Sequence, residues 1–229
     1  MPAWIIGATT NAAMNALHPL AIYAAVQAHK NEPLEYPGTL EAWLGVCEHS
    51  SAMLTGYLSE WAVLTPACAN NKLNASDTSP LPNNRLWPEL ARWYGAPGFH
   101  GPELDESKIT TIEPPADKPT PLGYGPPAKT RFNWTLSQWA GKPENHAAWK
   151  ELMAKHGLNH DPFEDIEGHF VFGDAAAWGL AMALSMNKAR RLGWTGFVDT
   201  RESLFKAYGE LGRLGMLPPL IVDRAEPLV

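Results

Sequence analysis

The stretch AWIIGATTNAAMNALHPLAIYAAVQAHKN, residues 3–31, decides the fold class. It starts with a continuous apolar run containing the β-branched pair Ile5 and Ile6, which predicts a short buried strand. A polar loop follows, and then apolar residues recur at helical spacing, with Pro19 either in the first turn or kinking the helix. The recurring residues are Met14, Leu17, Tyr23 and Val26. A strand, a loop and a helix in this order predict an α/β fold.

The rest of the chain is predicted to be mostly helical. Helical patterns lie at residues 52–64, 85–95, 135–140, 143–156, 174–192 and 200–211. Side-chain oxygens are expected to cap three of these helices, at Ser50 or Ser51, at Asn83 or Asn84, and at Thr200. Two weaker strands are predicted, KLNAS at 72–76 and WTGFVD at 194–199. Because no hairpin signal separates the strands, any sheet should be small and parallel.

Residues 96–129 are so rich in Pro and Gly that they predict a loop or flap rather than regular structure. The sequence contains no visible internal repeat. We therefore expect a single domain over residues 1–229.

The composition excludes several classes of protein. The hydrophobic fraction is 45% and the charged fraction 18%, and the net charge of −6 argues against a nucleic-acid partner or an anionic membrane surface. The only two cysteines, Cys47 and Cys68, are too few for a disulfide scaffold. No apolar run is long enough to cross a bilayer, and the N-terminus does not look like a signal peptide. These features predict a cytoplasmic protein.

Four segments carry a resemblance to a known family. They are IIGATTNAAMNALHPLAIYAA (5–25), LARWYGA (90–96), MNKARRLGWTGFVDTRESL (186–204) and LGRLGMLP (211–218). In the same order, they resemble the C-terminal part of atypical short-chain dehydrogenases/reductases of the progesterone 5β-reductase and iridoid synthase type. This resemblance implies a Rossmann-like fold with a helical lobe that closes over hydrophobic enones, terpenoids or steroids.

The resemblance also implies which part of such a reductase is encoded. In the family, the NADPH-binding glycine loop and the catalytic Tyr/Lys pair lie upstream of the strand that residues 3–7 match. We therefore expect a truncated, Rossmann-like substrate lobe without the cofactor-binding half, and no cofactor.

Two features of the sequence agree with that expectation. The only match in spelling to a dinucleotide loop, GELGRLG at 209–215, follows a helix instead of joining a strand to a helix. A Lys four residues after a Tyr would lower the pKa of the phenol for proton transfer, and none of the six Tyr residues is followed by Lys at that spacing.

The candidate site lies in the loop and first turn after the first strand, because ligands of parallel sheets bind at the carboxyl ends of strands. We predict His18 and Asn11 as catalytic residues, since an imidazole can donate a proton or polarise a carbonyl near neutral pH. The predicted substrate-binding residues are Thr10, Met14, Asn15, Trp178, Met182, Met186, Leu204, Phe205 and Tyr208.

Two other groupings favour structural interpretations. His156 and His160 are spaced as helical metal ligands, but Gly157 interrupts the helix and favours a solvated turn. Glu48–Ser51 places an acid, an imidazole and hydroxyls side by side, which is more typical of a helix start than of acid–base catalysis. We predict no metal.

Three functional hypotheses remain. The first is a cofactor-independent cyclase or isomerase, such as a Diels–Alder enzyme, acting on a hydrophobic terpenoid or polyketide intermediate of secondary metabolism. The second is a fragment of an NADPH-dependent enone reductase. The third is a non-catalytic module that binds a small apolar ligand. An uncovered strand edge predicts a homodimer or a larger partner complex, with Trp4, Ile5 and Ile6 at the interface or repacked under a rearranged helix.

Overall fold

The computed structural model describes residues 2–10, 15–114, 129–179 and 183–227 as a mixed α/β structure that is about half helical. Its helices are α1 (His18–His29), α2 (Leu40–Leu44), α3 (Ala52–Leu64), α4 (Asn83–Tyr94), α5 (Leu136–Ala140), α6 (Pro143–His156), α7 (Ile166–Trp178), α8 (Asn187–Arg191) and α9 (Thr200–Arg213). Short 3₁₀ turns lie at Pro66–Cys68, Glu106–Lys108 and Pro162–Asp165.

The strands pair in twos. They are β1 (Trp4–Ile6), β2 (Leu34–Glu35), β3 (His49–Ser51), β4 (Phe99–His100), β5 (Thr110–Ile112) and β6 (Thr130–Phe132). The pairs β1–β3 and β2–β4 are parallel, as predicted, whereas β5–β6 is antiparallel. The antiparallel pair was not foreseen. The prediction that residues 96–129 lack regular structure is wrong in part, because β4 and β5 both lie within this range.

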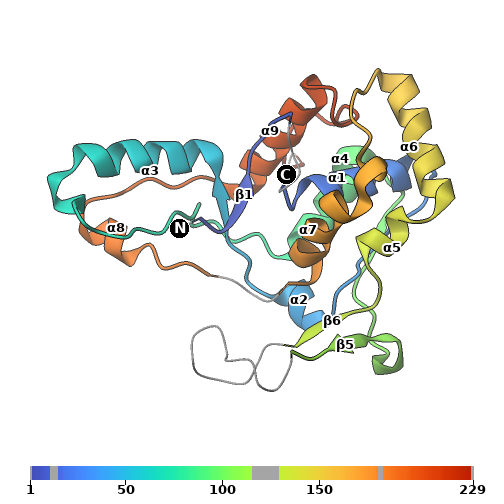
Figure 1. Ribbon diagram of the computed structural model, residues 1–229, viewed down its shortest axis with the longest axis horizontal. Coiled ribbons are helices and arrows are strands. Elements are labelled where there is room, and N and C mark those ends of the chain that lie inside the picture. The colour runs from blue at the N-terminus through green and yellow to red at the C-terminus, as the bar shows by residue number, and fades with distance from the viewer. Residues whose placement is uncertain (1, 11–14, 115–128, 180–182, 228–229) are drawn as a thin grey trace.

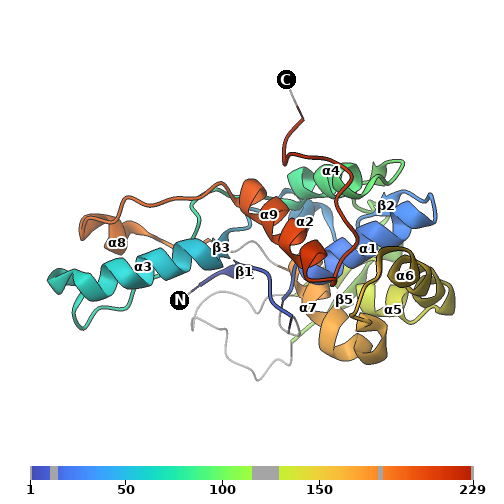
Figure 2. The same ribbon diagram turned by 90° about the horizontal axis from the view of Figure 1, so that it is seen from above.

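Helix α1 forms the centre of the core. Every residue from His18 to Gln27 is buried, and a helix that is buried all round needs neighbours on all sides. Helices α4, α6 and α7 supply them (Figures 1 and 2). Pro19 lies in the first turn of α1, where its missing N–H costs nothing. The first strand and the helix after it are thus confirmed in position. The strand is not buried throughout as predicted, because Trp4 is only partly buried and Ile5 is 54% exposed.

A second, smaller cluster lies in a projection of the molecule. Helices α3 and α8 lie side by side and extend away from the other helices in both views (Figures 1 and 2). Leu58, Ala75, Met186 and Ala189 are buried between them. We call residues 52–75 and 183–194 the α3–α8 arm.

A buried carboxylate joins β3 to α9. Asp77 accepts hydrogen bonds from the backbone N–H of Ser51 at 2.7 Å and from the Ser51 hydroxyl at 2.9 Å. On its other side it accepts a longer bond from Thr200 Oγ1, at 3.4 Å. Burial raises the pKa of Asp77 in spite of these donors.

Three predicted elements are wrong in detail. The helix predicted at 174–192 is not continuous, because α7 ends at Trp178 and Gly179 has an extended backbone. The predicted strand 194–199 forms no ladder, although Val198 N–H donates to the Asp77 carbonyl oxygen. In 72–76 only Ala75 makes an isolated bridge, to Pro2.

The predicted caps also shift. Ser51 occupies the N-cap position of α3, but its hydroxyl donates to Asp77 instead of capping the helix. Asp199, not Thr200, caps α9 by accepting a hydrogen bond from Glu202 N–H at 3.0 Å. Asn83 is the first residue of α4, and its amide belongs to a buried hydrogen-bond network described below.

None of the helices in the described part of the chain combines the length and the apolar character that a membrane span requires.

Candidate functional site

The loop between β1 and α1 contains the first predicted site residues. Asn15 donates from Nδ2 to the Gly7 carbonyl at 3.0 Å. Its Oδ1 accepts from the backbone N–H groups of Leu17 and His18, each at 3.2 Å. The amide of Asn15 therefore closes the turn that starts α1. Thr10 is exposed, whereas the predicted residues Asn11 and Met14 lie outside the described residues.

His18 is fully buried, and it lines neither of the two pockets described below. Its Nε2 lies 3.4 Å from the Met216 carbonyl, and its ring centroid lies 5.5 Å from that of His160. Burial, followed by the nearby imidazole of His160, lowers the pKa of His18 to about 3. The ring is therefore neutral near pH 7. A catalytic role for His18 stays a prediction.

The predicted α9 residues lie in the core. Leu204 and Tyr208 are almost fully buried, and Tyr208 Oη donates to the Leu17 carbonyl at 2.7 Å. Phe205 packs edge-on against Trp93, with ring centroids 5.3 Å apart. The Tyr208–Leu17 bond attaches α9 to the residue just before α1.

The predicted wall along residues 178–186 is divided between two places. Met186 is buried in the α3–α8 arm, whereas Trp178 stacks on Phe132 with ring centroids 4.9 Å apart. Met182 lies outside the described residues. The structure brings Trp178 into a pocket without Met186.

This pocket, which we call the Trp178 pocket, has a volume of about 320 Å³. It is lined by Thr39, Glu41, Ala42, Lys129, Arg131, Trp178 and Gly179. Arg131 pairs with Glu106 and lies 3.9 Å from Glu41. Lys129 pairs with the exposed Glu113. The pocket thus combines one aromatic wall with two cations that are each paired with a carboxylate. The guanidinium of Arg131 has five N–H groups, so it can still donate to the carbonyl oxygen of an apolar ligand.

Residues distant in the sequence build the Trp178 pocket. Strand β6 pairs with β5 and also bridges from Phe132 to Gly38. Asn133 N–H donates to the Pro37 carbonyl at 2.7 Å, which fixes the loop before α2 beside β6. These pairings place Arg131 and Thr39 at one opening.

A buried hydrogen-bond network supports the wall of this pocket. Tyr36 Oη donates to the Ala177 carbonyl at 2.6 Å. Asn83 Nδ2 lies within hydrogen-bonding distance of three oxygens, those of Tyr36 Oη and of the Ala42 and Ala177 carbonyls. The last turn of α7, and with it Trp178, is therefore held by Tyr36, just after β2, and by Asn83 of α4, which also bonds to α2.

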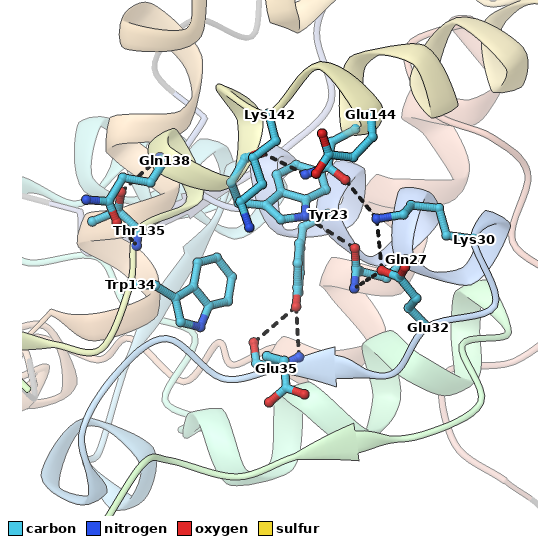
Figure 3. A pocket seen from close by; sticks show the side chains of 12 residues that line it. Tyr23, Gln27, Lys30, Glu32, Glu35, Trp134, Thr135, Gln138, Lys142 and Glu144 are labelled. Atoms are coloured by element: carbon cyan, nitrogen blue, oxygen red, sulfur yellow. Dashed lines mark hydrogen bonds and ion pairs between the residues drawn. The ribbon is translucent and has the colours of Figure 1, made fainter. Parts of the chain in front are cut away.

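A second pocket, of about 420 Å³, lies between the C-terminal end of α1 and helices α5 and α6 (Figure 3). Its aromatic side chains are Tyr23, Trp134 and Trp139, and its rim carries Lys30, Glu32, Glu35, Gln138, Lys142 and Glu144. The ring centroids of Tyr23 and Trp134, which Figure 3 shows side by side, are 5.4 Å apart. Tyr23 Oη both donates to and accepts from the backbone of Glu35.

The polar groups beneath this second pocket are paired with each other (Figure 3). Trp139 Nε1 donates to Gln27 Oε1, and Gln27 Nε2 donates to Glu32. Lys30 joins Glu32 to Asn145, whose Nδ2 donates to the Trp139 carbonyl at 2.7 Å. Because these groups satisfy one another, the pocket offers a binding surface rather than a reactive group.

No cluster of three or more His, Cys, Asp or Glu side chains in the described part of the chain has the geometry to hold a metal ion. Cys47 and Cys68 are both free thiols. Burial raises the pKa of Cys47 to about 11, so its thiol is protonated and unreactive near pH 7.

Sequence reasoning missed Arg131 and Lys129. They stand in the short run AKTRF at the end of the Pro/Gly-rich segment. Two cations separated by Thr130, the second of them directly before Phe132, were the only available signal. This signal does not by itself distinguish a site from a solvated loop.

The chain is distantly homologous to part of an atypical short-chain dehydrogenase/reductase of the iridoid synthase and progesterone 5β-reductase type. The (S)-8-oxocitronellyl enol synthase CYC2 of Camptotheca acuminata is 28% identical over 219 residues, which make up 95% of this chain and 48% of that protein. The short chain dehydrogenase gsfE of Penicillium aethiopicum is 26% identical over 227 residues, 95% of this chain and 53% of gsfE.

A steroid-converting relative extends the comparison. The 3-oxo-Delta(4,5)-steroid 5-beta-reductase of Arabidopsis thaliana is 26% identical over 202 residues, 88% of this chain and 44% of that protein. No protein-family model matches the chain. The chain thus spans about half the length of the curated relatives it matches, and the family resemblance predicted from the sequence is confirmed.

Proposed function

We propose that this chain binds a hydrophobic unsaturated carbonyl compound of secondary metabolism in the Trp178 pocket and catalyses a redox-neutral cyclisation or double-bond isomerisation. The observation that carries the proposal is the pairing of an aromatic wall, Trp178 stacked on Phe132, with the guanidinium of Arg131 in one pocket. The names of two relatives support the substrate class, because both name an oxo group on a hydrocarbon skeleton, citronellyl in one and a steroid in the other.

The residues of the pocket have distinct roles in this proposal. Trp178 packs against the hydrocarbon skeleton and excludes water. Arg131 and Lys129 donate to the carbonyl oxygen, where negative charge develops when a conjugated system enolises or closes a ring. One well-placed donor of this kind is worth about 3 kcal/mol of barrier lowering. The polarising role goes to Arg131 because His18 is enclosed in the core.

Both reactions balance without hydride. An isomerisation moves one proton from one carbon to another, and a cycloaddition converts π bonds into ring bonds, so substrate and product have the same mass. We therefore retain, as part of this proposal, the expectation that the reaction uses no nicotinamide cofactor.

The test is turnover by the purified, nucleotide-free chain. Unsaturated terpenoid aldehydes and steroid enones are incubated with the protein, and products are separated by chromatography with mass detection. We expect isomers of unchanged mass, formed by the wild type and by Arg213→Met, whose exposed guanidinium is a matched control. Arg131→Met should lose this activity. Tight binding without turnover would instead indicate a binding module.

The alternative is that the chain forms the substrate-binding part of an NADPH-dependent enone reductase. The observation that favours it is the match to about half of each relative. A product two mass units heavier than the substrate, formed only when NADPH is present, would select this alternative and overturn the redox-neutral reaction.

A further inference from the structure

The second pocket, which we call the Trp134 pocket, has a rigid aromatic floor. The Tyr23 ring meets the Trp139 ring edge-on, with an angle of 84° and centroids 5.0 Å apart. The Tyr23 hydroxyl donates to the Glu35 carbonyl at 3.2 Å and accepts from the Glu35 N–H at 2.7 Å. These contacts hold the floor in place before a ligand arrives, which lowers the entropy cost of binding.

Trp134 is the aromatic side chain of this pocket that a ligand can reach. It is partly buried, whereas Tyr23 is 1% exposed and Trp139 is 7% exposed. The Tyr23 and Trp134 rings are tilted by 48° to each other, so they are not stacked face to face. Because Trp134 also lines the pocket, its indole offers an apolar surface to a ligand there.

The rim of the Trp134 pocket carries hydrogen-bonding groups that are not used by the fold. Lys142 and Glu144 are exposed, and neither side chain pairs with another group in the described part of the chain. Gln138 Oε1 accepts from the Thr135 N–H at 3.2 Å within the capping box of α5. The amide oxygen is thus engaged, and the NH₂ group of Gln138 is left to donate to a ligand.

Donors and acceptors lie on opposite sides of the aromatic rings. Figure 3 shows Trp134 and Tyr23 between Lys142 on one side and Glu35 on the other. Glu35 Oε1 binds His100 Nδ1 at 2.6 Å, and the second carboxylate oxygen can still accept a hydrogen bond. A ligand that fills this pocket therefore needs groups that accept on one side and groups that donate on the other.

The charges of the pocket disfavour an ionic ligand. Lys30 and Glu32 form an ion pair of 2.9 Å and neutralise each other. The other charged groups in the described lining are the ammonium of Lys142 and the carboxylates of Glu35 and Glu144. A phosphate would meet the carboxylates and an organic cation would meet the ammonium, and like charges repel. A neutral ligand with hydroxyl groups suits both signs, because a hydroxyl both donates and accepts.

We propose that the Trp134 pocket binds a pyranose ring, such as the sugar unit of a glycoside. The C–H groups on one face of the sugar pack on the Trp134 indole, and the hydroxyls at the edge of the sugar bind Lys142, Glu144 and Glu35. The volume of about 420 Å³ falls within the range of roughly 300–1,000 Å³ that is usual for small-molecule sites. The pocket shares no lining residue with the Trp178 pocket, so the inference does not rest on the proposed function.

The experiment measures binding of neutral sugars to the whole purified chain. Methyl glycosides of glucose, galactose, mannose and rhamnose are titrated into the millimolar range, and saturation-transfer NMR gives the dissociation constants. We expect at least one of these sugars to bind, and Trp134→Leu to raise its dissociation constant at least about tenfold. Trp134→Tyr keeps an aromatic face and should raise it less. The matched control is Trp194→Leu, at another partly buried tryptophan in the α3–α8 arm, which should bind as the wild type does.

A variant of the exposed rim keeps the test valid if circular dichroism shows that Trp134→Leu does not fold. The double variant Lys142→Met, Glu144→Met removes one donor and one acceptor and leaves the net charge unchanged. It should raise the dissociation constant at least about fivefold. Its control is Lys72→Met, Glu60→Met, an exposed pair in the α3–α8 arm, which should keep the wild-type value.

Three results would overturn the proposal. The first is that none of the methyl glycosides binds. The second is sugar binding that neither the Trp134 variants nor the rim variant weakens, because the sugar would then occupy another place. The third comes from inorganic phosphate and tetramethylammonium, titrated in parallel. If either ion binds and the rim variant weakens that binding while no sugar competes, the pocket recognises an ion instead of a neutral sugar.

Discussion

The hydroxyl of Tyr36 donates a 2.6 Å hydrogen bond to the carbonyl oxygen of Ala177, 141 residues away in the sequence. Both groups are buried, and Ala177, which accepts the bond, directly precedes Trp178 in the sequence. Burial raises the pKa of Tyr36, so the phenol is protonated and remains a donor near neutral pH. The bond thereby couples the loop after β2 to the wall of the Trp178 pocket.

Tyr36→Phe should destabilise the protein by about 1–2 kcal/mol, because it removes a buried donor from Ala177 and a buried acceptor from Asn83. Denaturant unfolding followed by circular dichroism measures this loss. The matched control is Tyr57→Phe, where the phenol is exposed and the change should stay within about 0.5 kcal/mol. If Tyr36→Phe lowers the free energy of unfolding no more than Tyr57→Phe does, the Tyr36 hydroxyl makes no net contribution to stability.

The protein should lose stability as the pH falls from 7 to 5. Burial lowers the pKa of His18 to about 3 and that of His49 to about 4, whereas both titrate near 6.5 when unfolded. Between these values the unfolded chain binds the additional proton, so acid favours unfolding, and each histidine contributes about 2 kcal/mol of loss over this interval. Denaturant titrations at pH 7, 6 and 5 measure the slope.

The contribution of His18 can be isolated by substitution. Burial raises the pKa values of Asp77 and Asp174, and this acts in the opposite direction, since a carboxyl group that is more easily protonated when folded gains stability in acid. His18→Gln should therefore reduce the difference between pH 7 and pH 5 by about 2 kcal/mol relative to the wild type. An unchanged slope in His18→Gln would contradict the assignment.

Local sequence signals were sufficient for the elements with clear ends. The strand at Ile5 and Ile6, the helix that starts near Pro19 and the helix ends at Gly95 and Gly157 all appear as predicted. Both glycines have a left-handed backbone, with φ of +80° and +65°, which explains why a glycine marks each end.

The break between α7 and α8 was not predictable from periodicity. Residues on both sides of Gly179 are apolar and suit a helix, so the pattern continues through it. The structure supplies the reason for the break, because the extended backbone at Gly179 brings its α-carbon so close to the Ala175 carbonyl that a Cβ would lie 2.2 Å from that oxygen. Only the tertiary arrangement carries this information.

The candidate site was predicted in part for the same reason. Trp178 was chosen from its place beside a predicted apolar wall, and the structure places it in a pocket. Arg131 reaches that pocket only through the pairing of Phe132 with Gly38, which are 94 residues apart. Contacts of this kind leave no periodic or spacing signal in a single sequence.

Two Gly→Ala substitutions should have opposite effects on stability. Gly179→Ala forces the Cβ against the Ala175 backbone and should cost about 1–3 kcal/mol, since a backbone atom cannot give way cheaply. Gly56→Ala lies in the middle of α3, where nothing is within 4 Å of the added methyl, and should stabilise by about 0.5–1 kcal/mol. Thermal and denaturant unfolding test both, and a stabilising Gly179→Ala would show that α7 can continue as a helix.

Arg131 and Trp178 should affect different kinetic constants if the Trp178 pocket holds the substrate as proposed. Arg131 acts on charge that develops during the reaction, so Arg131→Met should lower kcat by about a hundredfold with a smaller change in KM. Trp178 packs against the skeleton equally in the bound and reacting states, so Trp178→Leu should mainly raise KM. Steady-state kinetics with an isomerised substrate separate the two. Suppose instead that Trp178→Leu greatly lowers kcat and that Arg131→Met leaves the kinetics unchanged. The reacting carbonyl would then not lie near the guanidinium, and the proposed arrangement in this pocket would be wrong.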